Sequence, residues 1–206
     1  MDGAADTAVG DVTATWNGGG SPFGVSWRKM MMWWFIVTDA LLFAGFLAAY
    51  GFNRLAAPAW PQQETVFSMN FIAAMTFVLI SSSATMATAV GGAHRGDLKT
   101  AFRFTALTVL GGLGFLGMQA WEWSHVIGAG ATLTHNPWGV ADFGAFFFMI
   151  TGFHGTHVLI GVIILLVTAI RVKMGKTRAE GVELAGLYWH FVDLVWVFIF
   201  GFFYLI

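Results

Sequence analysis

Five long apolar stretches, separated by short polar segments, set the pattern of the chain. A helix that crosses about 30 Å of hydrocarbon needs roughly 20 residues at about 1.5 Å each, and every stretch is close to that length. They are residues 30–52, 66–93, 104–123, 143–170 and 184–206. Strands of a membrane barrel would alternate apolar and polar residues, whereas these stretches are continuously apolar. The pattern therefore predicts an all-α fold, an integral membrane bundle of five transmembrane helices.

The start of the chain differs from the rest. Residues 1–27 are mostly polar and rich in glycine, so we expect a disordered tail there, followed by one membrane domain at residues 28–206. A secretory signal would have a basic start and then an apolar core of roughly 7–15 residues, and neither is present. We therefore expect the chain to insert through its own spans.

Basic residues predict the orientation of the bundle. All but one of the 10 Lys and Arg residues precede the first stretch, or lie between the second and third or between the fourth and fifth; the exception is Arg54. Basic residues near span ends stay on the cytoplasmic side of the membrane. We therefore expect a cytoplasmic N-terminus and, after five crossings, a C-terminus outside, in the periplasm of a Gram-negative host.

The amino-acid composition limits the partners and metal sites that the chain can have. Hydrophobic residues make up 57% of the chain and charged residues 10%, with a net charge of −1. Nucleic-acid binding depends on clustered Lys and Arg that neutralise phosphates, so we expect no nucleic-acid partner. The chain has no cysteine, which excludes disulfides, thiolate metal sites and iron–sulfur clusters. A bound metal would need histidine or carboxylate ligands.

One carboxylate interrupts the first apolar stretch. A charge near the centre of a span costs about 2.5–3.5 kcal/mol on insertion scales, so it usually faces a protein interior and has a task. Asp39 lies roughly 13 Å from the cytoplasmic end of its stretch at about 1.5 Å per residue. Asp39 is thus a candidate proton carrier; the structural alternative is a protonated carboxyl group hydrogen-bonded to a neighbouring helix.

Other polar residues in the apolar stretches come in pairs spaced three apart, which places both members on one helix face. The pairs are Glu122 with His125, His154 with His157, and His190 with Asp193. Pairs on two helices could surround a metal, and two histidines could hold a haem. The carboxylates are few, however, and we favour hydrogen-bonded pairs that orient helices. Gly111, Gly114 and Gly117 recur at helical spacing, which predicts that a neighbouring helix packs closely against them.

The closing sequence ELAGLYWHFVDLVWVFIFGFFYL strongly resembles the final helix of subunit III of haem–copper respiratory oxidases. GFHGTHVLIGVIILL resembles that family's preceding helix, and MQAWEW resembles a third element. TDALLF, around Asp39, occupies the place of a carboxylate-bearing motif in an earlier helix. The resemblance covers residues 28–206, and five helices match the family's shorter bacterial form. The family often has Glu in place of Asp39, although Asp also occurs, notably among quinol oxidases.

The resemblance implies an accessory subunit of a cytochrome c oxidase in the bacterial cytoplasmic membrane. It would have no catalytic residue and no cofactor or metal of its own, with haems and copper in partner subunits. It would contact subunit I directly, with subunit II and phospholipids as further partners, and support assembly, lipid binding and proton uptake by subunit I. Cytochrome c or quinol would reach it only through the complex, which reduces dioxygen and translocates protons.

The resemblance also implies roles for individual residues. Asp39 would lie near the region of proton uptake. The buried polar interior of the bundle would comprise Glu122, His154, His157, Glu183, His190 and Asp193. The aromatic faces, with Trp189 and Trp196, would bind lipid tails or pack helices.

Alternatives remain within and outside this family. The chain could serve a quinol oxidase or be a homologue associated with nitric oxide reductase. Another class is an independent proton channel or transporter, although the sequence shows no inverted repeat of the kind that many transporters have. The last alternative is a cofactor-bearing membrane enzyme, with His154, His157 and His190 as ligands of the cofactor.

Overall fold

The computed structural model describes residues 24–205, and the ordered elements within this range are all helical. Five helices are long and apolar enough to cross a membrane: α2 (Trp27–Ala56), α4 (Met69–His94), α5 (Leu98–Gly128), α6 (Ala141–Lys173) and α7 (Ala179–Ile199), which continues as the π-helix η1 (Phe200–Leu205). A single short helix, α3 (Gln63–Val66), precedes α4. The predicted all-α fold with five membrane-length helices is confirmed. Most of the predicted tail, residues 1–23, lies outside the described residues.

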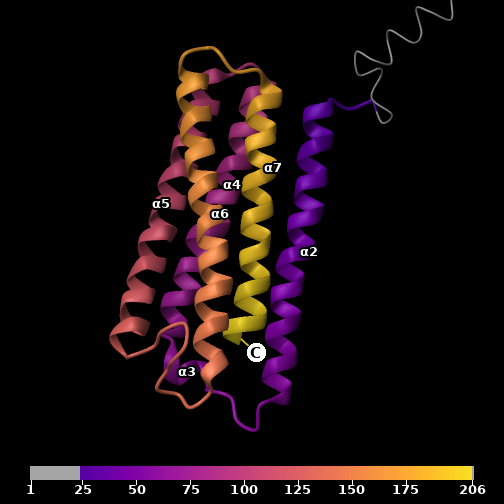
Figure 1. Cartoon of the computed structure of the whole chain (residues 1–206). Coiled ribbons are helices and arrows are strands. Elements are labelled where there is room, and N and C mark those ends of the chain that lie inside the picture. The colour runs from indigo at the N-terminus through magenta and orange to yellow at the C-terminus, as the bar shows by residue number, and fades with distance from the viewer. Residues whose placement is uncertain (1–23, 206) are drawn as a thin grey trace, which may run out of the picture.

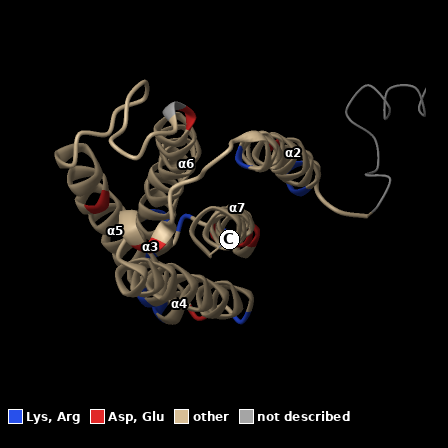
Figure 2. Cartoon of the chain, turned by 90° about the horizontal axis from the view of Figure 1, so that it is seen from below, with Lys and Arg blue, Asp and Glu red and all other residues tan. Residues whose placement is uncertain are grey.

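The helices form a four-helix bundle with a fifth helix against one side (Figure 1). In the bundle, α5 packs on α4 and α6, and α7 packs on the same two helices. The remaining span, α2, packs on α6 and α7. Viewed end-on in Figure 2, α7 therefore lies between α2, α4 and α6. The final helix is the structural centre of the molecule.

Polar caps extend the helices beyond the apolar stretches. The Asp97 carboxylate accepts hydrogen bonds from the backbone N–H groups of Lys99 and Thr100, both at 3.1 Å, which starts α5 at Leu98 rather than near the predicted residue 104. The Thr100 hydroxyl also donates to this carboxylate, and these hydrogen bonds lower the pKa of Asp97. Gly96 has φ +76°, which suits the tight reversal between α4 and α5.

The second span begins later than the sequence predicts. The stretch 66–93 was predicted as one helix, but α3 ends at Val66 and α4 begins at Met69. Between them Phe67 is extended, and its ring packs against Phe147 at 5.3 Å and Tyr204 at 4.9 Å between centroids. The interruption thus coincides with burial of the Phe67 side chain, which is 6% exposed.

Two tryptophans of α7 fill the centre of the bundle. Trp189 and Trp196 are both 0% exposed. Their indole N–H groups donate to hydroxyl groups of α4, from Trp189 to Ser82 and from Trp196 to Thr76, both at 3.0 Å. Both rings therefore pack against protein with their polar atoms satisfied.

Glycines make room for the Trp189 ring, but they are not the glycines of the predicted series. A Cβ atom at Gly112 would lie 2.5 Å from the Trp189 ring, and one at Gly161 would lie 2.9 Å from it. In the predicted series, a Cβ atom at Gly111 would come within 2.7 Å of Ser82, whereas one at Gly114 would make only an ordinary contact of 3.8 Å with Val78. A Cβ atom at Gly117 would have no heavy atom within 4 Å. The close approaches thus lie at Gly111, against Ser82 of α4, and at Gly112, against the Trp189 ring.

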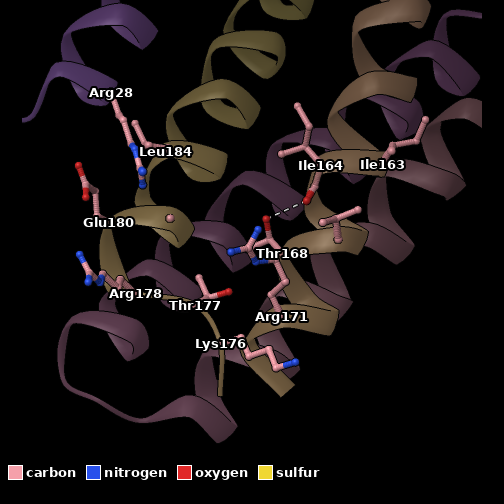
Figure 3. Close-up of a pocket in the computed structure, with 12 residues that line it drawn as sticks. Arg28, Ile163, Ile164, Thr168, Arg171, Lys176, Thr177, Arg178, Glu180 and Leu184 are labelled. Carbon is pink, nitrogen blue, oxygen red and sulfur yellow. Dashed lines mark hydrogen bonds between the residues drawn. The ribbon is translucent and has the colours of Figure 1, made fainter. Parts of the chain in front are cut away.

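Basic residues gather at one end of the bundle, here called the basic end. It comprises the start of α2 and the α4–α5 and α6–α7 connections, with Arg28, Lys29, Arg95, Lys99, Arg103, Arg171, Lys173, Lys176 and Arg178. Arg54 lies at the opposite end, where α2 finishes. A cavity opens at the basic end between α6 and α7, with Arg28 of α2 at its rim (Figure 3).

Candidate functional site

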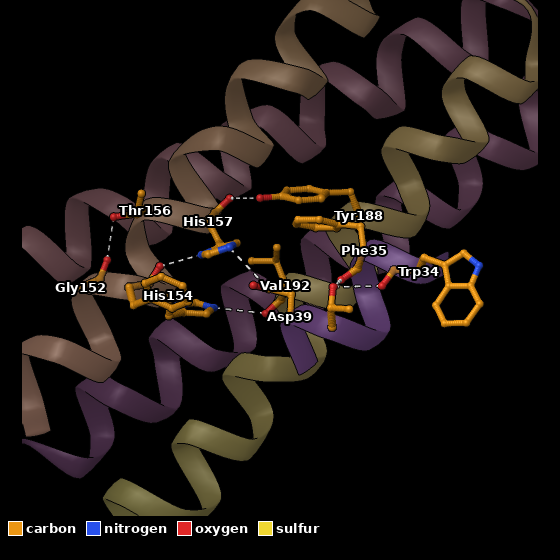
Figure 4. Close-up of polar contacts among 11 residues, drawn as sticks. Trp34, Phe35, Asp39, Gly152, His154, Thr156, His157, Tyr188 and Val192 are labelled. Atoms are coloured by element: carbon orange, nitrogen blue, oxygen red, sulfur yellow. Dashed lines mark hydrogen bonds and ion pairs between the residues drawn. The ribbon is translucent and has the colours of Figure 1, made fainter. Parts of the chain in front are cut away.

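A polar contact between α2 and α6 lies within the membrane-spanning part of the chain (Figure 4). Asp39 Oδ2 of α2 lies 3.3 Å from His157 Nε2 of α6. Both side chains are 11% exposed. The lone carboxylate of the first span therefore has a titratable partner on another helix, and this Asp39–His157 pair is the candidate functional site.

The second ring nitrogen of His157 fixes its tautomer. Nδ1 lies 2.9 Å from the backbone carbonyl oxygen of Phe153, one turn earlier in α6. A carbonyl oxygen can only accept, so Nδ1 carries a hydrogen. Asp39 Oδ2 has no hydrogen-bond partner among the described residues, so its contact with the facing Nε2 is an ion-pair contact, favourable for imidazolium with carboxylate; one proton could otherwise reside on the carboxylic acid beside a neutral imidazole. The pair can hold a proton on either partner.

Aromatic rings surround the pair. The Phe43 ring lies edge-on to His157 with centroids 5.5 Å apart, and Phe153 packs on the same imidazole at 4.7 Å. The Tyr188 hydroxyl donates to the backbone carbonyl of His157 at 3.2 Å and ties α7 to this turn of α6. Low polarity around the pair strengthens the electrostatic interaction between its members.

His154 lies one turn from His157 but contacts a different helix. Its ring is 0% exposed, and Nε2 lies 3.2 Å from the backbone carbonyl oxygen of Val192 in α7. Phe115 and Trp196 flank the ring at centroid distances of 5.6 Å and 5.1 Å. Since Nε2–H donates to that carbonyl, His154 helps to join α6 to α7 and does not converge with His157.

The predicted pair in α7 contacts α4. His190 Nδ1 lies 2.6 Å from the Ser83 hydroxyl, and this hydrogen bond replaces the predicted one to Asp193. Asp193 is 9% exposed, and its Oδ1 has no hydrogen-bond partner among the described residues. The two side chains thus line the α4–α7 contact without forming the predicted mutual pair.

Glu122 forms a separate polar contact away from the basic end. It is 4% exposed and accepts a hydrogen bond from the Tyr204 hydroxyl of η1 at 3.2 Å. His125 instead has Nδ1 3.1 Å from the backbone carbonyl of Trp121. The predicted Glu122–His125 pair is therefore replaced by a link between α5 and the end of the chain.

Glu183, which the resemblance places in the polar interior, lies partly buried at the basic end. It forms an ion pair with Lys29 of α2, and His94 Nε2 of α4 lies 3.6 Å from its other carboxylate oxygen. One turn earlier in α7, Glu180 accepts a hydrogen bond from Ser26, which also caps α2. These contacts tie the start of α2 to the start of α7.

The polar side chains do not converge on a common point. Across residues 24–205, no group of three His, Asp or Glu side chains has the arrangement of a metal site. His154, His157 and His190 each contact a different partner: a carbonyl of α7, a carboxylate of α2 and a hydroxyl of α4. The arrangement can hold a proton at one pair and orient helices elsewhere.

Comparisons with known proteins show which family the sequence resembles. The family model described as cytochrome c oxidase subunit III matches residues 11–206. Quinol oxidase subunit 3 of Bacillus spizizenii is 35% identical, with 82% of this chain and 81% of that protein covered. The probable cytochrome c oxidase subunit 3 of Nocardia farcinica is 32% identical, with 80% of each chain covered.

A further relative spans nearly the whole sequence. Cytochrome c oxidase subunit 3 of Alkalihalophilus pseudofirmus is 30% identical, with 100% of this chain and 98% of that protein covered. The family match covers all five membrane-length helices and the Asp39–His157 pair. The chain belongs to the cytochrome c oxidase subunit III family.

Proposed function

We propose that this chain is the accessory subunit III of a haem–copper terminal oxidase in a bacterial cytoplasmic membrane. The family match and the five membrane-length helices support this role. The basic end would face the cytoplasm, because basic residues near span ends are retained on that side. The C-terminus, at the opposite end of α7, would then lie outside (Figure 1).

The complex would transfer electrons to dioxygen and translocate protons, while this chain holds no cofactor. Haems and copper would lie in partner subunits, with subunit I in direct contact and subunit II in the same assembly. In this chain, the imidazoles of His154 and His190 contact protein groups on other helices, which supports a structural role for these two residues. Phospholipids would cover the exposed apolar faces of the bundle.

The Asp39–His157 pair is the observation that supports a role for this chain in proton uptake. Its two members come from different helices, lie 3.3 Å apart and can share one proton. It lies within the span of α2, which begins at the basic end. From the cytoplasmic side, such a pair would hold a proton near subunit I and support its uptake when protons are scarce.

The electron donor has two candidates. We favour cytochrome c, because the closing motif YWHFVDLVW is nearer to that branch of the family. Quinol remains the alternative, since the relative from Bacillus spizizenii is named a quinol oxidase subunit. Oxygen consumption by the purified complex with reduced cytochrome c, and separately with a quinol, would distinguish the two.

Purification through an affinity tag on this chain tests the assignment. We expect haem-bearing and copper-bearing subunits to co-purify, and the separated chain to show no stoichiometric haem absorbance or metal. Haem or metal bound to the separated chain would contradict the accessory role. Reconstitution of the chain alone in liposomes tests the alternative: proton flux would support an independent channel, and we expect none.

A further inference from the structure

Tyr188 of α7 contacts both helices that carry the Asp39–His157 pair (Figure 4). Its hydroxyl donates to the backbone carbonyl of His157 in α6 at 3.2 Å. Its ring stacks on Phe35 of α2, with centroids 5.9 Å apart and an angle of 26° between the ring planes. Phe35 lies one turn before Asp39, so the two residues share a face of α2. One side chain of the final helix therefore contacts the turn that precedes Asp39 and the turn that holds His157.

The surroundings of Tyr188 fix the position of its ring. The residue is 4% exposed, although it belongs to a helix long enough to span the membrane. A Cβ atom at Gly161 of α6 would lie 3.2 Å from the Tyr188 ring, so the lack of a side chain there lets the ring approach α6 closely. Gly161 follows His157 by one turn. The ring therefore packs on the turn of α6 that begins at the His157 carbonyl.

Little of α2 is buried, so its position depends on individual contacts. Its buried residues are Phe43 and Tyr50, and 11% of its most apolar window is buried. The ion pair of Lys29 with Glu183 fixes the start of the helix, about 15 Å along the axis from Asp39. Phe43 packs on the imidazole of the pair from α2 itself. Tyr188 supplies the contact from α7 at the depth of the pair.

The Asp39–His157 pair is sensitive to small movements of α2. Asp39 Oδ2 and His157 Nε2 lie 3.3 Å apart, and their attraction falls by more per ångström where little water is present. The titratable neighbours of His157 in residues 24–205 are Asp39 from α2, Tyr188 from α7 and His154, one turn earlier in α6. Asp39 is the carboxylate among them. A change in its distance therefore alters how the imidazole holds a proton.

We propose that Tyr188 is the positioning residue of the Asp39–His157 pair. Its hydroxyl on the His157 carbonyl and its ring on Phe35 hold α2 and α6 at the separation at which carboxylate and imidazole meet. The effect of Tyr188 on proton uptake rests on the proposed function, whereas its effect on the geometry of the pair does not.

The test measures the titration of His157 by ¹⁵N NMR, on the full chain in mixed detergent micelles with ring-labelled histidine. His157→Gln identifies the signals of this residue. Tyr188→Phe removes the hydroxyl and keeps the ring. We expect it to displace the His157 titration midpoint from the wild-type value toward that of Asp39→Asn, by roughly half of their difference, because one of the two contacts is lost. An unchanged midpoint would overturn the proposal.

Tyr204→Phe is the matched control for the lost hydroxyl. Tyr204 is 1% exposed, and its hydroxyl also donates at 3.2 Å, to Glu122 of α5. Since this hydrogen bond joins neither member of the pair, the His157 midpoint should stay at the wild-type value. Equal displacement by Tyr188→Phe and Tyr204→Phe would overturn the proposal, because loss of any buried hydroxyl would then have the same effect.

The ring contact is tested on α2. Phe35→Leu removes the stacking on Tyr188 and should displace the His157 midpoint in the same direction as Tyr188→Phe. Phe52→Leu makes the same change on the same helix, at a residue that is 75% exposed, and should leave the midpoint unchanged. Equal midpoints in the two variants would overturn the proposal that Tyr188 holds α2 in place.

Turnover of the purified oxidase separates this proposal from the proposed function. Tyr188→Phe should match wild type at acid pH and lose turnover at alkaline pH, in the same range as Asp39→Asn but by less. A displaced His157 midpoint with wild-type turnover at every pH would support the positioning role and overturn the role of the pair in proton uptake. An unchanged midpoint with turnover lost at alkaline pH would overturn the positioning role alone.

Discussion

Helices α2 and α7 run side by side but are held in different ways. Half of the most apolar window of the final span is buried, compared with 11% for α2. The buried residues of α2 are Phe43 and Tyr50, whereas α7 buries Trp189 and Trp196 at the centre of the bundle. The bundle is held mainly by close packing, and α2 by a few specific contacts.

The difference follows from the membrane environment. Lipid tails are as apolar as leucine side chains, so helices associate through close packing and interhelical hydrogen bonds. The Asp39–His157 pair and the Lys29–Glu183 ion pair are polar links of this kind, and both join α2 to the rest of the molecule. Changes in the bundle should therefore impair folding, and changes on α2 should affect its position and its chemistry.

The largest effect is expected at Gly112 of α5, which the Trp189 ring of α7 approaches across the bundle. Gly112→Ala would place a methyl group 2.5 Å from the Trp189 ring, and overpacking of this kind costs about 1–3 kcal/mol. Gly117→Ala, on the same helix, meets no heavy atom within 4 Å and is the matched control. Unfolding of each variant in mixed detergent micelles measures the difference. Equal stability of the two variants would show that close packing of the Trp189 ring against Gly112 does not stabilise the bundle.

The glycines of α5 show how much of this structure could be predicted from the sequence. Five apolar stretches were enough to predict five membrane-length helices, because length and continuity of apolar residues set the spans. The spacing of Gly111, Gly114 and Gly117 indicated a packing face, but Gly112 makes the closest approach to Trp189. That approach depends on which face of α5 points toward the Trp189 side chain, which periodicity within one helix does not determine.

The candidate site was predictable only in part. Asp39 was identified because a carboxylate in an apolar span is costly. Its partner was not, since spacing along α6 grouped His157 with His154, although the two contact different helices. Depth alone would not have paired them: at about 1.5 Å per residue, Asp39 lies about 18 Å from the basic end of α2 and His157 about 24 Å from that of α6.

A smaller effect is expected at the polar link of α2. Double-mutant cycles across membrane helices give about 0.6 kcal/mol on average and up to about 1.7 kcal/mol. A cycle with Asp39→Asn and His157→Gln should show coupling in this range, because the two side chains lie 3.3 Å apart. A cycle of Asp39→Asn with His190→Gln should be additive, since His190 contacts Ser83 of α4. Additivity in both cycles would mean that the pair does not fix α2.

The smallest effect is expected at the exposed cap of α5. Thr100 lowers the pKa of the Asp97 carboxyl below its ordinary value of 3.8, so the stabilisation by this carboxylate is present at neutral pH. It is lost as pH falls through the lowered pKa. Asp97→Ala should reduce stability slightly at pH 7 and less at pH 2, whereas Asp97→Asn should retain the cap. Thermal unfolding in detergent at the two pH values measures this change.

The most direct test of the account is the proton-to-electron ratio and turnover of the purified oxidase as pH rises. With protons scarce, loss of a group that holds one near the uptake region should slow delivery most. Asp39→Asn should therefore match wild type at acid pH and lose both turnover and pumping at alkaline pH. The control Glu64→Gln alters a carboxylate of α3 outside the spans and should follow wild type. If Asp39→Asn also follows wild type across the whole pH range, the Asp39–His157 pair has no role in proton uptake.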